Sequence, residues 1–375
     1  METSFLTPLA ARRGFGIGAQ GLALYRVVYG AFALFVVAPG HGPYARFVPL
    51  SDLPASFLHP PPGPFLLLQS PPPIWVVQCG EAALIAALVA VTVGWRTRLA
   101  SVLATLLMLG LYGLLYSYGK INHNLLFILT PVVMAFSGWG AALSVDSLED
   151  RRRFGGDTGR RPAAGPLLLL ALLVGFAWFT GGFSKLIGGW LDPSSRAVQG
   201  HVIKQVVLRS RVDLLAPFAA SLPTSIAWEA ADWSTVAFEL SALAAVVHIR
   251  VARVIASLAV LFHLGTALLM NIGAFVVLLP VYAAFADWDA VAARLRLRPL
   301  PRRAEWPMLA ASLGVGAGLY LWGSPLLLLE QFSPFASDLM VTEFLLLAGA
   351  SVLAVAYLVT RWPSRRRIRP PRPRS

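Results

Sequence analysis

Long apolar runs separated by short polar connections limit what this chain can fold into. A helix that crosses a bilayer needs about 20 mostly apolar residues, and by that rule the sequence holds about ten spans. They are expected near 20–38, 73–94, 99–117, 123–143, 165–185, 230–248, 252–270, 272–287, 307–328 and 339–360. The eighth is short and contains Pro280, so about nine spans is the alternative. The sequence therefore predicts an all-α, polytopic transmembrane helical bundle.

Composition agrees with a membrane protein and argues against a soluble one. Only 13% of the residues are charged, against about 25% in soluble domains, and the mean hydropathy is +0.68. The net charge of +13 lies in short runs between apolar segments, so we expect no nucleic-acid partner. The single cysteine, Cys79, excludes an intramolecular disulfide, and no Cys/His pattern predicts a metal site.

Arginine-rich connections alternate with connections that carry little positive charge. The basic ones precede the first span and follow the second, fourth, sixth, eighth and tenth, so they are expected on the cytoplasmic side. With ten spans both termini are cytoplasmic, and richness in Ala, Arg and Pro favours a bacterial plasma membrane. The Pro-rich segment 39–72 and segment 186–229 are long outside loops, the second with short interfacial helices.

The same pattern predicts the organisation of the chain. We expect a cytoplasmic N-terminal segment, a large transmembrane domain, a basic cytoplasmic loop, two additional transmembrane helices and a disordered basic cytoplasmic tail. These regions cover residues 1–18, 19–290, 291–306, 307–360 and 361–375, respectively.

Polar side chains at membrane depth gather in the outer half of the predicted bundle. A charged group at this depth costs about 2.5 kcal/mol even on lenient scales, so it usually faces a cavity, a partner or a substrate. The residues concerned are Glu81, Lys120, Asn122, His123, Lys185, Glu229, Asp232, Glu239, His263 and Asn271. Their common depth predicts one polar cavity near the outer leaflet, with Arg26 in the first span as an exception.

Each of these residues also has a structural interpretation. Lys120 and Lys185 can snorkel to water, and Asn122 can cap a helix. His123 fits an interface position, and His263 fits a hydrogen-bonded packing role. Glu239 and Glu81 can be structural partners, Glu239 for Arg26 or for a lysine. In favour of a site, Lys185 follows GFAWFTGGF, whose glycines allow another helix or a ligand to approach closely.

Three ordered stretches carry a family resemblance that covers roughly residues 15–290. They are YGKINHNLLFILTPVVMAFSGWGAALSVDSL, FAWFTGGFSKLIGGWL and ELSALAAVVHIRVARVIASLAVLFHLGTALLMNIGAFVV. Together they resemble the HTTM (horizontally transferred transmembrane domain) family, which includes the membrane part of vitamin K-dependent gamma-carboxylase. The resemblance implies that Lys185 is the base that deprotonates a hydroquinone. It also implies that Asn122 and His123 support the oxyanion, and it matches Phe262 and His263 to a later Phe-His pair.

The carboxylase continues into a large lumenal domain that binds its protein substrate. Here that region is replaced by two more predicted spans and a basic tail, so protein carboxylation is not implied.

Two main hypotheses for function follow. In the first, the chain is a quinol-handling membrane enzyme. Lys185 is the general base, His123 and His263 are further catalytic residues, and menaquinol or vitamin K hydroquinone is the isoprenoid substrate. Asn122, Glu239, Glu81, Lys120 and Asp232 are then the predicted substrate-binding residues. In the second, the bundle is a non-enzymatic scaffold, immunity or assembly protein with an unknown protein partner. A transporter for a small anion is a third alternative.

Overall fold

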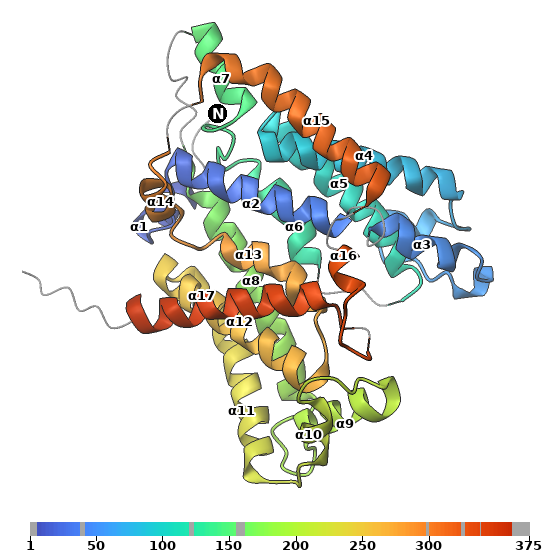
Figure 1. Ribbon diagram of the computed structural model, residues 1–375. Coiled ribbons are helices and arrows are strands. Elements are labelled where there is room, and N and C mark those ends of the chain that lie inside the picture. The colour runs from blue at the N-terminus through green and yellow to red at the C-terminus, as the bar shows by residue number, and fades with distance from the viewer. Residues whose placement is uncertain are drawn as a thin grey trace, which may run out of the picture.

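The computed structural model describes residues 6–37, 42–119, 124–154, 162–297, 300–323, 327–337 and 339–361. Within these ranges every regular element is a helix and there is no strand (Figure 1). This confirms the predicted all-α class.

Among the described residues, six helices are long and apolar enough to cross a membrane. They are α2 (Ala19–Val37), α4 (Ile74–Val93), α5 (Thr97–Tyr116), α8 (Gly165–Ile187), α12 (Ile249–Met270) and α17 (Val341–Arg361). Each coincides with one of the apolar runs predicted to span the bilayer. A bent pair raises the count to seven, and the prediction of about ten spans is not confirmed for the described residues.

The remaining predicted spans are shorter or broken. The run 123–143 forms α6 (Leu125–Met134), and the run 230–248 forms α11 (Ile226–Ser241) followed by η3 (Ala242–Val246). The run 272–287 gives η4 (Ala274–Leu278) and α13 (Leu279–Ala283), and this pair meets α14 (Trp288–Arg294) at a bend of 76°. Asp287 causes this restart, because its side chain caps α14 through the amide of Ala290.

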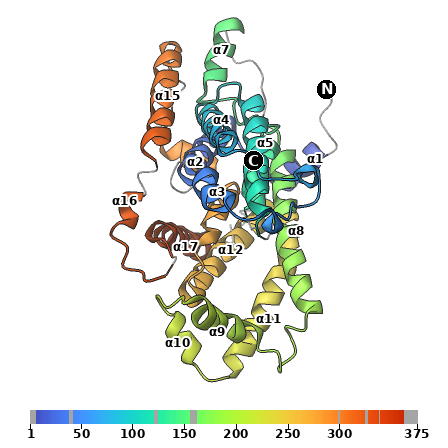
Figure 2. The same ribbon diagram turned by 90° about the vertical axis from the view of Figure 1, so that its right-hand side faces the viewer.

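The other elements are short, apart from α15, which occupies the predicted span 307–328. They are α1 (Leu6–Arg12), α3 (Pro43–Ser51), η1 (Ala55–Phe57), η2 (Pro64–Leu67), α7 (Val145–Phe154), α9 (Ala197–Arg209), α10 (Ala216–Ser221), η5 (Arg302–Ala304), α15 (Glu305–Trp322) and α16 (Leu327–Glu330). Helices α9 and α10 lie beside the lower end of α11, and α7 lies at the opposite end of the molecule (Figures 1 and 2). Segment 186–229 contains the short helices α9 and α10, and their predicted interfacial location stays a prediction.

Arg26 on α2 is fully buried, and backbone oxygens hold its guanidinium. The two terminal nitrogens donate to the carbonyls of Trp139 at 2.7 Å and Leu143 at 2.6 Å. Arg26 thereby ties α2 to the turn that follows α6. The alternative in which Arg26 is the partner of Glu239 is therefore wrong, because Glu239 pairs with a lysine, as the next section describes.

Carboxylates from distant parts of the chain close several helix N-termini, where backbone N–H groups have no partner within the helix. Asp146 accepts hydrogen bonds from the amides of Arg96 and Thr97 at the start of α5, at 2.7 and 2.9 Å. Four other carboxylates accept backbone amides in the same way. Glu81 does so at α3, Asp232 at α9, Asp289 at the residue before α2, and Glu330 at α17. These acids are cross-links between elements, and the helix dipole favours their charge there.

The connections that the sequence assigns to one side of the membrane contact one another. On the basic side, Arg13 donates to the carbonyl of Val246 at 3.0 Å, which joins the N-terminal segment to the connection between α11 and α12. On the other side, Arg211 donates to the carbonyl of Asn271 at 2.8 Å, and Asp213 accepts the amide of Ser337 at 2.8 Å. These contacts join connections that are distant in the sequence, and the predicted sidedness of the connections stays a prediction.

Candidate functional site

Lys185 lies in the last turn of α8 and points at a carboxylate. Its Nζ donates to both oxygens of Glu239 on α11, at 2.8 Å to Oε1 and 2.6 Å to Oε2. The lysine side chain is 25% exposed and the glutamate side chain only 5%. The carboxylate is therefore enclosed by protein, whereas the ammonium retains one accessible side on which a second molecule can bind.

A glycine allows this contact between α8 and α11. A Cβ atom on Gly182 would lie 2.7 Å from the Cβ of Glu239 and 2.9 Å from the backbone nitrogen of Leu240. Both distances are too short for real contacts, so only glycine lets the two backbones approach this closely. The close approach brings Glu239 to the level of Lys185, one turn further along α8.

An aromatic ring lies on another side of the lysine. After α8 ends, the chain turns back through Gly189 at φ +78°, and the amide of Trp190 donates to the carbonyl of Lys185 at 3.1 Å. The Lys185 ammonium then lies 5.2 Å from the centre of the Trp190 ring, within cation–π range. The other neighbour of Trp190 is His201 on α9, with ring centres 5.3 Å apart.

His201 is part of the electrostatic environment of the pair, outside the apolar helices. Burial lowers the pKa of its imidazole, and the positive charges of Lys204 and Lys185 lower it further, while Asp232 acts in the opposite direction. The neutral form of the ring beside Trp190 is therefore favoured, which limits the positive charge next to the lysine.

His263 lies in a separate aromatic cluster deeper in the bundle. Its ring is 2% exposed and stacks on Phe275, with centres 4.3 Å apart. Its Nε2 lies 2.9 Å from the hydroxyl of Tyr282, which also accepts the indole N–H of Trp178 at 3.3 Å. Trp178 is two turns before Lys185 on α8, so this helix links the cluster to the Lys185–Glu239 pair without direct contact between them.

Two predicted binding residues have other partners. Glu81 is buried and accepts the amide of Tyr44 at 2.8 Å, which fastens α3 to α4. Asp232 is fully buried and accepts the amides of Ala197 and Val198, at 3.2 and 2.7 Å. The structure does not bring either carboxylate to Lys185. The single cavity predicted from membrane depth is therefore resolved, for the described residues, into several local sites.

Lys120, Asn122 and His123 lie outside the described residues. Their predicted roles beside Lys185 and His263 stay predictions.

The arrangement of Lys185, Glu239 and Trp190 is suited to binding and moving a proton. The ammonium and the carboxylate share a short hydrogen bond, so a proton can pass between them without a change in net charge. Among the described residues, no group of three or more His, Cys, Asp or Glu side chains is placed to hold a metal ion. The side chains present at this site form an acid–base pair beside an aromatic surface.

The sequence singles out Lys185, Glu239 and His263 but not their aromatic partners. By residue type alone, Trp190, Tyr282 and Trp178 do not differ from the interfacial aromatics that membrane proteins carry. The signal for Trp190 was the Gly188-Gly189 pair between it and Lys185, which allows the chain to turn back.

Comparisons with known proteins identify the family. No curated protein and no solved structure matches the chain. A family model described as HTTM domain matches residues 17–288, which is well over half of the chain and includes Lys185, Glu239 and His263. The protein therefore belongs to the HTTM domain family.

Proposed function

We propose that this membrane protein is an enzyme that deprotonates an isoprenoid quinol, with the Lys185–Glu239 pair as the proton acceptor. The observation that carries the proposal is the bidentate ion pair itself, whose carboxylate is enclosed and whose ammonium is partly open. An ionisable pair in an apolar bundle is costly, and such groups usually serve a function.

The proton balance follows from the geometry. The ammonium of Lys185 passes one proton to Glu239 and takes the phenolic proton of the quinol. A quinol, an ammonium and a carboxylate thus become a phenolate, an ammonium and a carboxylic acid. The positive charge stays next to the new oxyanion and stabilises it electrostatically. Lys185 is the residue that contacts the substrate, and Glu239 is the final acceptor.

The surroundings of the pair suit an apolar substrate with one polar edge. Phe183 and Leu186 on the last turns of α8 are 49% and 41% exposed, and both flank Lys185 in the sequence. Trp190 adds a flat ring, against which a quinol can stack. An isoprenoid tail would extend into the lipid beside α8, which is long and apolar enough to cross a membrane.

Family membership and charge pattern support the setting. HTTM resemblance suggests menaquinol or vitamin K hydroquinone as substrate, with Asn122 and His123 next to the oxyanion. The arginine distribution suggests a bacterial plasma membrane with both termini cytoplasmic, which places Lys185 in the outer leaflet.

The test uses the purified full chain in lipid nanodiscs with a reduced menaquinol added. Lipid extraction with mass spectrometry measures bound quinone, and the absorbance of the phenolate measures deprotonation. The wild type is expected to retain quinone and to give a phenolate signal at pH 7. Lys185→Gln and Glu239→Gln should lose the phenolate signal about 100-fold, the usual effect of a positioned acid–base group.

Lys204→Gln is the matched control, because Lys204 is an exposed lysine on nearby α9. Unchanged phenolate formation in Lys185→Gln would rule the proposal out. Loss of thermal stability without any quinone binding by the wild type would instead favour the non-enzymatic scaffold, in which the ion pair only fastens α8 to α11.

A further inference from the structure

An apolar groove lies far from the Lys185–Glu239 pair, among α2, α12, α13 and α17. Its volume is about 540 Å³, within the range of ligand sites. Much of its wall is formed by Val28, Phe32, Val260, Leu279, Leu346 and Leu353. Three of the four helices are apolar enough to span the membrane, and Leu353 is 73% exposed at the rim. The groove therefore opens to the hydrocarbon of the bilayer.

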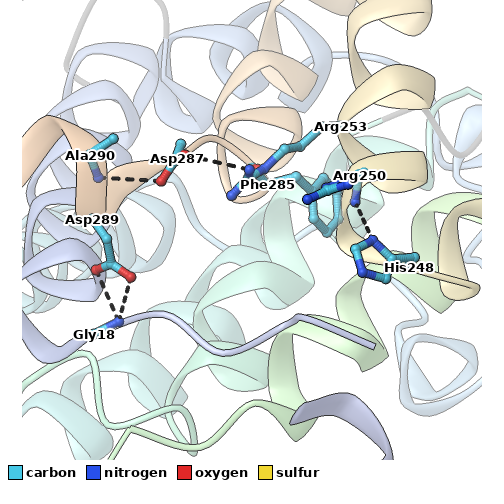
Figure 3. Close-up of polar contacts among 8 residues, drawn as sticks. All are labelled: Gly18, His248, Arg250, Arg253, Phe285, Asp287, Asp289 and Ala290. Carbon is cyan, nitrogen blue, oxygen red and sulfur yellow. Dashed lines mark hydrogen bonds and ion pairs between the residues drawn. The ribbon is translucent and has the colours of Figure 1, made fainter. Parts of the chain in front are cut away.

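One end of the groove is polar and contains an arginine. Arg253 lines it together with Asp287. The Nε of Arg253 donates to the carbonyl of Phe285 at 2.7 Å, and its Nη1 lies 3.6 Å from Asp287, a loose ion pair (Figure 3). Arg250, one turn earlier on α12, is exposed.

The positive charge at this end is only partly compensated. Asp287 also caps α14 through Ala290 and is 49% exposed, so it is shared with a helix end and with solvent. Within the described part of the chain, the Arg253 side chain donates one hydrogen bond, which goes to the carbonyl of Phe285. An arginine at the end of an apolar trough thus retains N–H groups for an anion from the membrane.

We infer that the groove binds an anionic phospholipid, with an acyl chain in the apolar trough and the phosphate at Arg253. Basic pockets between transmembrane helices on the cytoplasmic side bind anionic headgroups in this way. Net charge decides between candidates, because the headgroup of a zwitterionic lipid carries a positive group beside its phosphate, and Arg253 and Arg250 repel that group. The site shares no residue with the proposed quinol site, so either proposal can fail alone.

The direct test is native mass spectrometry of the delipidated full chain in detergent. Phosphatidylglycerol and phosphatidylcholine with identical chains are added separately, and bound lipid is counted. The wild type should retain phosphatidylglycerol about fivefold better, the effect of one basic residue near an anionic lipid. Arg253→Gln should abolish that preference, whereas Arg98→Gln, an exposed arginine on α5, should keep it.

A second variant tests the trough without touching the arginine. Gly349 on α17 lines the groove, and a Cβ there meets no atom within 4 Å. Gly349→Leu should therefore fill the trough and reduce retention of phosphatidylglycerol at least fivefold. Gly314→Leu on α15 is the control, because Gly314 also faces open space but lies outside the groove.

Three results would overturn the inference. The first is equal retention of both lipids by the wild type. The second is equal lipid retention by Gly349→Leu and Gly314→Leu. The third is stabilisation of the protein by inorganic phosphate alone to the same degree as by phosphatidylglycerol, which would indicate an anion site without a lipid. If Arg253→Gln does not fold, the two glycine variants still decide the outcome.

Discussion

Most of the acidic side chains described above accept hydrogen bonds from backbone N–H groups, whereas Glu239 faces a lysine. Asp232 and Glu81 each accept backbone amides and have no basic side-chain partner among the described contacts. Glu239 has the ammonium of Lys185 on both oxygens. This difference distinguishes a carboxylate that can exchange a proton with a partner from carboxylates whose role is to close helix ends.

Lys185→Ala should destabilise the protein by about 3 kcal/mol, because it leaves the carboxylate of Glu239 enclosed without its counter-ion. Lys185→Met combined with Glu239→Leu should recover most of this loss, since both charges are then removed. Thermal unfolding of the purified protein in a neutral detergent measures both effects. A double variant as unstable as the single one would show that packing, and not charge, dominates at this position.

At the scale of helices, the contact between α8 and α11 depends on the absence of one side chain. Gly182→Ala places a Cβ 2.7 Å from that of Glu239, so the helices must separate. The expected cost is about 1–3 kcal/mol, with loss of the Lys185–Glu239 hydrogen bonds. Thermal unfolding measures the first effect, and the phenolate assay measures the second.

Gly110→Ala on α5 is the control for this substitution. A Cβ on Gly110 meets no atom within 4 Å, and alanine is the better helix former. This variant should be neutral or slightly stabilising. Equal losses in Gly182→Ala and Gly110→Ala would mean that close packing at Gly182 is not required.

The helices themselves follow from apolar periods and lengths, and the sequence predicted the six long ones within a few residues. Breaks were harder to predict, because they depend on where a cap forms. The run 272–287 is apolar until its last residue, Asp287, and this residue restarts the helix at α14. In the same way, Lys185, Glu239 and His263 stand out by residue type. Their separation into two sites depends on which faces α8, α11 and α12 present to one another. A single sequence does not predict these relative helix orientations.

For the whole molecule, Asp213 joins the connection between α9 and α10 to the connection before α17. Burial tends to raise the pKa of its carboxyl, but hydrogen bonds from the Ser337 hydroxyl and from the amides of Ala336 and Ser337 lower it below 3.8 overall. The ionised form is thus favoured in the folded protein. Its contribution to stability is complete above the unfolded pKa and is lost as the pH falls through the lower, folded value.

Asp213→Asn should therefore reduce the unfolding temperature at pH 7, and the difference from the wild type should shrink at about pH 3. Thermal unfolding at the two pH values in a non-ionic detergent checks this. Asp52→Asn, an exposed position, should show no difference at either pH. If the difference in unfolding temperature between Asp213→Asn and the wild type stays constant with pH, the role of the ionised carboxylate is contradicted.

The buried guanidinium of Arg26 has a consequence for biosynthesis. The carbonyls of Trp139 and Leu143 that receive it are 113 and 117 residues further along the chain. At ribosomal speeds of about 5–20 residues per second, on the order of ten seconds pass before they emerge. During that interval the first apolar helix carries a charge without its acceptors. The nascent chain should therefore stay with the insertion machinery until residue 143 has been synthesised, and shorter chains should be cleared by proteolysis.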